Sequence, residues 1–99
     1  MIRGTTPTLQ FTTPVTADKL TCLYLTIAQD DAVVVEKQLT DCDCNGATVT
    51  CKLSQAETLQ LDASKDVEIQ VRAKTTEGDA MASQIYITSV DRILKEGEI

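Results

Sequence analysis

The chain has 99 residues, of which 42% are hydrophobic and 24% are charged, as in an ordinary globular protein. This length suffices for one domain, residues 1–99, with a single core. The formal net charge of −6 argues against binding to nucleic acid or to an anionic membrane, because both require clustered Lys and Arg. No segment has the pattern of a signal peptide, and no apolar run approaches the ~20 residues that a membrane span needs.

Alternating apolar and polar residues predict four short strands in the first half of the chain, at residues 8–12, 20–28, 32–39 and 47–53. In the first strand Leu9 and Phe11 share one face, and the flanking prolines suit a strand end or a sheet edge. In the second strand the apolar face contains Leu23, Leu25 and Ile27. The pair Asp30-Asp31 follows this strand, and we expect it to form a turn rather than to act in acid–base catalysis.

The third and fourth strands have the same two-residue period. The third is expected to place Val33, Val35 and Leu39 on one face, and the fourth is expected to bury Val49, Cys51 and Leu53. Asn45-Gly46 lies between these strands and is a strong turn signal, because both residues tolerate positive φ.

A helical connector is predicted near residues 54–60, where the strand pattern stops. Ser54 and Glu57 have the spacing of a capping box, in which each side chain accepts a hydrogen bond from a free backbone N–H of the first helical turn. We therefore expect one or two helical turns that connect two sheets.

The C-terminal third of the chain predicts a hairpin with one apolar and one polar side. We expect Val71 to pair with Ile85, and Ile69 to pair with Ile87, because opposed residues of an antiparallel pair share a face. The loop then consists of Glu77, Gly78 and Asp79. The polar side is expected to carry Glu68, Arg72, Lys74, Gln84, Tyr86 and Thr88.

Beyond Ser89 the apolar spacing changes phase, with apolar residues at Val90, Ile93 and Leu94. Either the strand bulges at this point or the chain leaves the sheet. The tail from Arg92 to Ile99 can pack on its own domain or on a neighbouring molecule, and the sequence leaves both alternatives open.

The chain contains no histidine, which excludes Ser–His and Cys–His nucleophile pairs and the commonest metal ligand. Its 4 glycines are scattered and form no phosphate-binding loop. Asp41 and Asp43 lie in an expected turn with too few regularly spaced oxygens for a calcium loop. We therefore expect neither an enzyme nor a cofactor.

The cysteines are expected to be reduced thiols, as is usual for a protein without a secretion signal. They are Cys22, Cys42, Cys44 and Cys51. Structural zinc sites typically use C-x₂₋₄-C pairs, whereas Cys42 and Cys44 are separated by one residue. Cys51 is expected to face the core and Cys22 to lie on the polar side of another strand, so we expect no metal site.

Five segments carry a resemblance to a known group of proteins: "GTTPTLQF", "VVVEKQLTDC", "VTCKLSQAETLQL", "VEIQVRAKTTEGDAMAS" and "RILKEGEI". Together they cover nearly the whole chain. The sequence resembles small structural proteins, associated with tails or baseplates, that are encoded in prophages of Gram-positive bacteria. It is similar to the β-sandwich N-terminal domains of baseplate upper proteins. The resemblance defines no binding residues.

The strand pattern predicts an all-β protein, an immunoglobulin-like antiparallel sandwich of about seven strands. The resemblance implies a non-catalytic structural or protein-interaction module of a phage or prophage particle, in its tail or baseplate. Such a module would bind other phage structural proteins and copies of itself, first in the host cytoplasm and then in the virion. The alternative is an immunoglobulin-like module that binds carbohydrate or a cell surface, for which only Tyr24 and Tyr86 offer suitable aromatic rings.

Contacts with other proteins are expected at strand edges and at the tail, because an edge strand presents free N–H and C=O groups to another chain. The candidate contact residues are Leu9, Phe11, Arg92, Ile93, Leu94 and Ile99.

Overall fold

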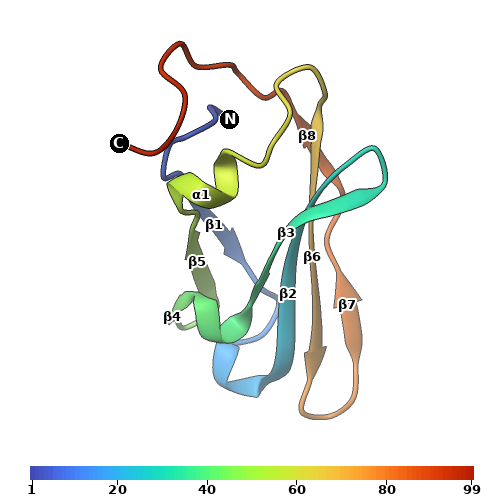
Figure 1. Cartoon of the computed structure of the whole chain (residues 1–99). Coiled ribbons are helices and arrows are strands. Elements are labelled where there is room, and N and C mark those ends of the chain that lie inside the picture. The colour runs from blue at the N-terminus through green and yellow to red at the C-terminus, as the bar shows by residue number, and fades with distance from the viewer.

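A computed structural model describes all residues from Met1 to Ile99, and it is built from two antiparallel sheets that face each other (Figure 1). The strands are β1 (Thr8–Thr12), β2 (Leu20–Gln29), β3 (Ala32–Gln38), β4 (Asp43–Asn45), β5 (Thr48–Lys52), β6 (Val67–Thr75), β7 (Ala80–Ala82) and β8 (Tyr86–Thr88). Helical structure is limited to α1 (Gln55–Thr58) and two 3-10 turns, Ala17–Lys19 and Leu39–Asp41. The predicted all-β class is confirmed, with eight strands.

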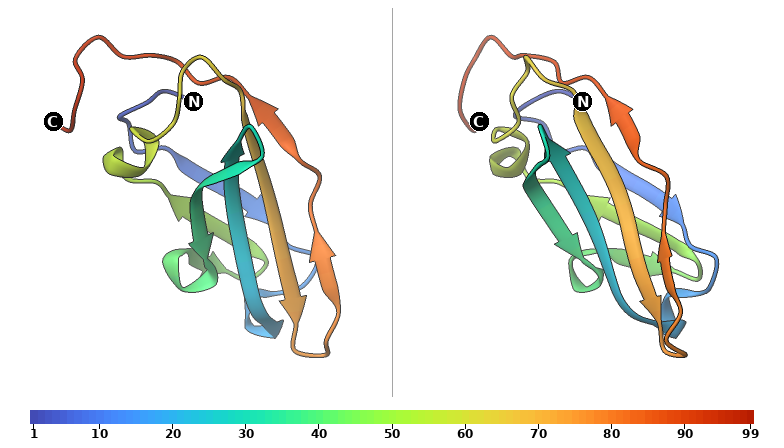
Figure 2. Two further views of the ribbon diagram at one scale, coloured as in Figure 1. Left: turned by 45° about the vertical axis from the view of Figure 1, so that its right-hand side comes forward. Right: turned by 90° about the vertical axis from the view of Figure 1, so that its right-hand side faces the viewer.

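The smaller sheet has the strand order β1-β5-β4, and the larger sheet has the order β3-β2-β6-β7. The short strands β7 and β8 pair with successive parts of β6, so both lie along the same edge of the larger sheet. The two sheets form layers that cross at an angle (Figure 2). The chain therefore has the architecture of a sandwich with four strand edges.

The core forms where inward-facing residues of the two layers meet. Leu23, Leu25 and Ile27 of β2 are at most 1% exposed, as the alternation along this strand predicts. Val49, Cys51 and Leu53 approach from the smaller sheet, and each is 0% exposed. The predicted interior faces of these two segments are confirmed.

The β2–β3 hairpin turns at Asp30 and Asp31, as predicted, and both residues adopt positive φ. A bulge between Ile27 and Ala28 shifts the register, so that Val33 is 59% exposed while Val35 remains buried. The expectation that Val33 and Val35 share the core face is therefore wrong, because the bulge inserts one residue and reverses the direction of every side chain beyond it.

The register of the C-terminal hairpin also differs from the expectation. Lys74 pairs with Ala80, and the loop is Thr76, Glu77 and Gly78, one residue earlier than predicted. Ile69 pairs with Tyr86 rather than with Ile87. Consequently Ile85 and Ile87 face outward and are 52% and 66% exposed.

The helical connector is confirmed. The Ser54 Oγ accepts a hydrogen bond from the backbone N–H of Glu57, and the Glu57 carboxylate accepts one from the N–H of Ser54. The same carboxylate lies 2.7 Å from the Lys37 Nζ of β3. Partial burial by itself raises the pKa of Glu57, but the hydrogen bonds from Lys37 and Ser54 outweigh it, so the pKa lies below its ordinary value.

The tail after β8 folds back over the end of the molecule that holds α1 (Figure 1). Val90 is buried, and the backbone of Asp91 pairs with Met1 and Arg3 at the N-terminus. The Arg3 guanidinium lies 2.9 Å from the Glu96 carboxylate. These contacts hold part of the tail on its own domain, while Leu94 and Ile99 remain exposed.

An isoleucine comparison tests the observed register. Ile27→Ala removes a fully buried side chain and should lower the free energy of unfolding by about 2–5 kcal/mol. Ile87→Ala changes an outward-facing side chain and should cost less than about 1 kcal/mol. Urea denaturation of both variants measures the difference, and equal losses would contradict the outward orientation of Ile87.

The ion pair of Glu57 predicts a pH dependence. Because its pKa is lowered in the folded state, its stabilisation is present above the ordinary Glu pKa of about 4.3 and is lost as the pH falls through the folded pKa. Glu57→Gln should therefore reduce the drop in urea midpoint between about pH 7 and about pH 3. Glu77→Gln, in an exposed loop, is the control and should leave that drop unchanged.

Candidate protein-interaction groove

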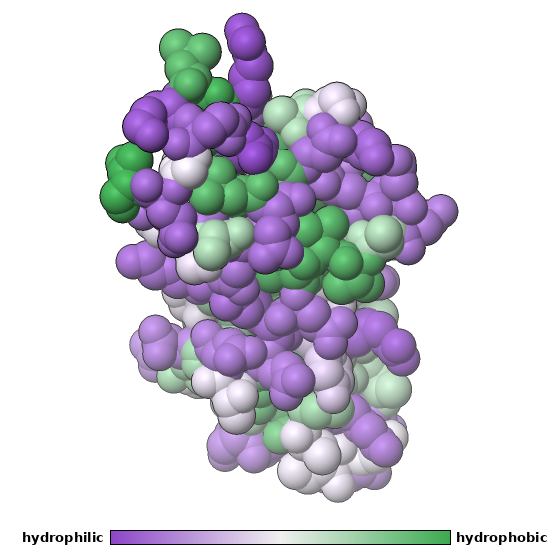
Figure 3. Space-filling model, viewed as in Figure 1, coloured by the Kyte–Doolittle hydropathy of each residue, from purple (hydrophilic) through white to green (hydrophobic).

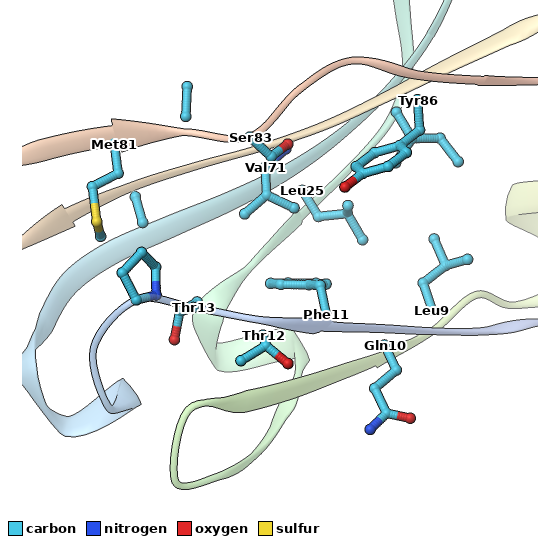
Figure 4. Close-up of a pocket in the computed structure, with 14 residues that line it drawn as sticks. Leu9, Gln10, Phe11, Thr12, Thr13, Leu25, Val71, Met81, Ser83 and Tyr86 are labelled. Carbon is cyan, nitrogen blue, oxygen red and sulfur yellow. The ribbon is translucent and has the colours of Figure 1, made fainter.

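An apolar groove opens along one side of the sandwich, between the edge strand β1 and the edge formed by β7 and β8. Its volume is about 660 Å³. The main side chains of its walls are Leu9, Phe11, Leu25, Val71, Met81 and Tyr86 (Figure 4). No residue that lines it is charged at neutral pH, so the groove suits apolar side chains rather than ionic ligands.

One wall of the groove is β1, whose alternation directs Leu9 and Phe11 inward. Figure 4 shows both side chains pointing into the groove, whereas Gln10 and Thr12 point away from it. Leu9 and Phe11 are only half-buried, because no element of the chain covers β1 on its outer side. These two residues therefore form an apolar strip beside an open edge.

The backbone of β1 has hydrogen-bonding groups that the fold does not use. The Thr13 N–H donates to the Ala47 carbonyl at 2.8 Å, and the Leu53 N–H donates to the Pro7 carbonyl at 2.9 Å. In an antiparallel pair every second residue forms backbone hydrogen bonds to the partner strand. These two bonds show that the odd-numbered residues of β1 are the ones that bond to β5. The N–H and C=O groups of Thr8, Gln10 and Thr12 point outward, and β1 pairs with no second strand.

The opposite wall depends on a break between β7 and β8. The Val71 N–H donates to the Ser83 Oγ rather than to a backbone carbonyl, while the Ser83 N–H donates to the Val71 carbonyl. β7 and β8 both pair with β6, and this irregularity shifts the register of that pairing by one residue from β7 to β8. As a result, Tyr86 turns towards the groove and remains 62% exposed at its rim (Figure 4).

The sequences that border the groove are free of charge. No charged residue occurs from Gly4 to Ala17, which includes β1, or from Ala80 to Val90, which includes β7 and β8. The edge strands on the other side of the sandwich do carry charges, at Glu36 and Lys37 in β3 and at Asp43 in β4. Natural edge strands usually carry charges that prevent pairing with other chains, so the groove edges lack this protection.

The predicted contact residues fall into two separate places. Leu9 and Phe11 line the groove. The tail residues lie at the α1 end of the molecule, where the Gln55 side chain bonds the backbone of Ile99 in both directions. Arg92 is exposed, Ile93 is half-buried, and Leu94 and Ile99 are 91% and 93% exposed.

Sequence reasoning missed the second wall of the groove, because it assigned Tyr86 to the polar side of the hairpin and did not consider Met81. A signal for the break was present in the sequence, since Ser83-Gln84 interrupts an otherwise apolar return strand. The uncharged segments that border the groove were a second signal.

The face of the molecule seen in Figure 3 is mainly hydrophilic, with separate hydrophobic patches. Tyr24 alternates with the buried Leu23 and Leu25, so it lies on the outer side of the larger sheet, whereas Tyr86 borders the groove. The two tyrosines therefore form no common aromatic platform of the kind that sugar binding uses.

The expectation of four reduced cysteines is wrong for two of them, since Cys42 and Cys51 form a disulfide. The 3-10 turn Leu39–Asp41 brings the chain back beside β5, and the two Cα atoms lie 4.6 Å apart. Cys22 and Cys44 are free, and Cys44 is exposed. No three cysteine or acidic side chains are grouped closely enough to hold a metal ion.

Two further ionisable groups have shifted pKa values, and both lie in the turns near α1 rather than in the groove. Hydrogen bonds from Ser64 lower the pKa of the Asp62 carboxyl. A hydrogen bond to Asp30 raises the pKa of Lys65. Each shift accompanies a local turn contact outside the groove.

Comparison with known proteins gives no relative for this chain. No protein-family model, no curated protein and no solved structure matches it. None of its helices has the length and apolar character needed to cross a membrane. Its function must therefore be inferred from the groove and from the sequence itself.

A thiol count tests the cysteine pairing. Denatured but unreduced protein should react at two thiols, Cys22 and Cys44. The variant Cys42→Ser should react at three thiols, because Cys51 loses its disulfide partner. Alkylation followed by mass spectrometry gives the counts, and four reactive thiols in the parent protein would contradict the disulfide.

Proposed function

We propose that this chain is a non-catalytic protein-interaction module of a phage or prophage particle, located in its tail or baseplate. The groove is the observation that carries the interaction role, because it combines apolar walls with two adjoining strand edges. Strand edges and alternate side-chain pockets are the two elements by which proteins recognise an extended strand. The sequence resemblance supports the assignment to a phage particle.

We also propose that the sandwich is immunoglobulin-like. In that fold one sheet contains strands A, B, E and D, and the other contains C′, C, F and G. The observed orders β1-β5-β4 and β3-β2-β6-β7 correspond to B-E-D and C′-C-F-G. On this assignment, strand A is the one position that no segment of the chain fills, and it lies beside β1.

A protein partner explains the groove better than a substrate or a sugar does. The chain has no histidine, and the groove wall contains no charged group that could serve as an acid or a base. Tyr86 is the only aromatic residue besides Phe11 at the groove, and Tyr24 lies elsewhere. The partners in this proposal are other phage structural proteins and copies of the chain itself, met in the host cytoplasm during assembly.

Mass spectrometry of particles released after induction of the host prophage tests this proposal. We expect the chain in stoichiometric amount with tail or baseplate proteins in density-purified particles. An abundant host cytoplasmic protein serves as the control and should be depleted. Absence of the chain from particles would contradict the proposal, and binding of the purified protein to host cell walls would favour the carbohydrate alternative.

A further inference from the structure

We propose that the groove is filled by β1 of a second copy of this chain, so that two copies associate about a two-fold axis beside β1. This inference rests on the proposed interaction role and names the partner of the groove. The two β1 strands would pair antiparallel and join the two smaller sheets into one continuous sheet. Each β1 would then occupy the strand A position of the other copy.

The unused backbone groups of β1 define how two copies can pair. Thr8, Gln10 and Thr12 present N–H and C=O groups at the free edge. An antiparallel pair needs residues with outward groups to stand opposite each other. This is achieved when Gln10 faces Gln10 of the second copy across the axis, and Thr8 faces Thr12.

The same register matches the apolar side chains. With Gln10 on the axis, Leu9 of each copy stands opposite Phe11 of the other. Such opposed residues share a face of the sheet, and here that face is the inner one. They also form a pair without backbone hydrogen bonds between them, which brings the side chains closest together. Leu9 and Phe11 of the second copy would therefore meet Val71, Met81 and Tyr86 across the groove.

Electrostatics favours this edge over the other edges. Each copy carries a formal net charge of −6, which opposes association at most orientations. The segments Gly4–Ala17 and Ala80–Val90 form an uncharged border around the groove, whereas β3 and β4 carry charged residues. The border of the groove is where two copies can approach without opposing like charges.

The exposed surface of this chain is larger than is usual for a folded chain of its size. A folded chain of 10.8 kDa ordinarily exposes roughly 5,500 Å², and this chain exposes 6195 Å². The groove residues Leu9, Phe11 and Val71 are only half-buried although they line the space between the sheets. Covering them would complete the core on its open side.

The C-terminal tail of a second copy is a weaker candidate for the groove. The last part of the tail is held on its own domain by the Arg3–Glu96 ion pair and by the hydrogen bonds between Gln55 and Ile99. Moving the tail would break these contacts. β1 needs no rearrangement, because its edge is already extended and open.

Sedimentation equilibrium of the purified full chain tests the inference. The parent protein should form a dimer at high concentration. Gln10→Pro removes an N–H that makes no bond in the monomer but would donate across the axis from each copy, so the dimer loses two hydrogen bonds. We expect the dissociation constant to rise by roughly 10–100-fold. Glu36→Pro is the matched control, because the hydrogen-bonding pattern between β2 and β3 leaves the Glu36 N–H on the free edge of β3. The Glu36→Pro variant should still form the dimer.

A second variant separates loss of pairing from loss of folding. Gln10→Lys keeps the N–H and places two like charges opposite each other on the axis, so it should also favour the monomer, more strongly at low salt. Thermal unfolding of each variant at low concentration checks that the monomer still folds. If Gln10→Pro failed to fold, Gln10→Lys alone would decide between dimer and monomer.

Three results would overturn the inference: a monomeric parent protein at all concentrations, a dimer unaffected by both Gln10 variants, or a dimer weakened equally by Glu36→Pro. A monomeric chain that is nevertheless found in particles would leave the proposed function standing and assign the groove to a strand of another protein. A dimer sensitive to Gln10, together with absence from particles, would contradict the phage role alone.

Discussion

Burial between the two sheets is the interaction on which the structure depends. Leu23 and Ile27 project from β2, an inner strand of the larger sheet, and pack with Val49 and Leu53 of the smaller sheet. Burying an aliphatic side chain of this size contributes about 1.5–3 kcal/mol, so this small set supplies a large share of the stability of a 99-residue domain. With few aromatic residues available, the core is thin and built from branched aliphatic side chains.

A thin core between unequal sheets leaves one side open. On the β3 and β4 side, the turn Leu39–Asp41 connects the two layers, and the Cys42–Cys51 disulfide joins the start of β4 to β5 within the smaller sheet. On the other side β1 and the β7–β8 edge are not connected by any strand, and the space between them is the groove. The function proposed for the protein follows from this asymmetry, because only the open side offers apolar walls and free backbone groups in one place.

The distribution of charge follows the same asymmetry. Edge strands are a hazard for most sandwiches, since they recruit other chains, and charged residues on the edge suppress such pairing. Here β3 and β4 have this protection, while β1, β7 and β8 lack it. A protein with one unprotected side and otherwise charged edges is suited to a single defined contact rather than to open-ended aggregation.

The sequence determined the strands with a regular two-residue period, the Asp30-Asp31 turn and the capped connector at Ser54, because each is specified by neighbouring residues. It also placed Leu9 and Phe11 on one face, and so identified half of the candidate groove. Only the tertiary structure decided the other half and the partner of Cys42. A bulge at Ser83 reverses the direction of Tyr86 through one inserted residue, and Cys42 stands opposite Cys51 because the short strand β4, which the sequence pattern did not indicate, pairs with β5. Such contacts join segments that are independent in the local pattern, and therefore the pattern does not encode them.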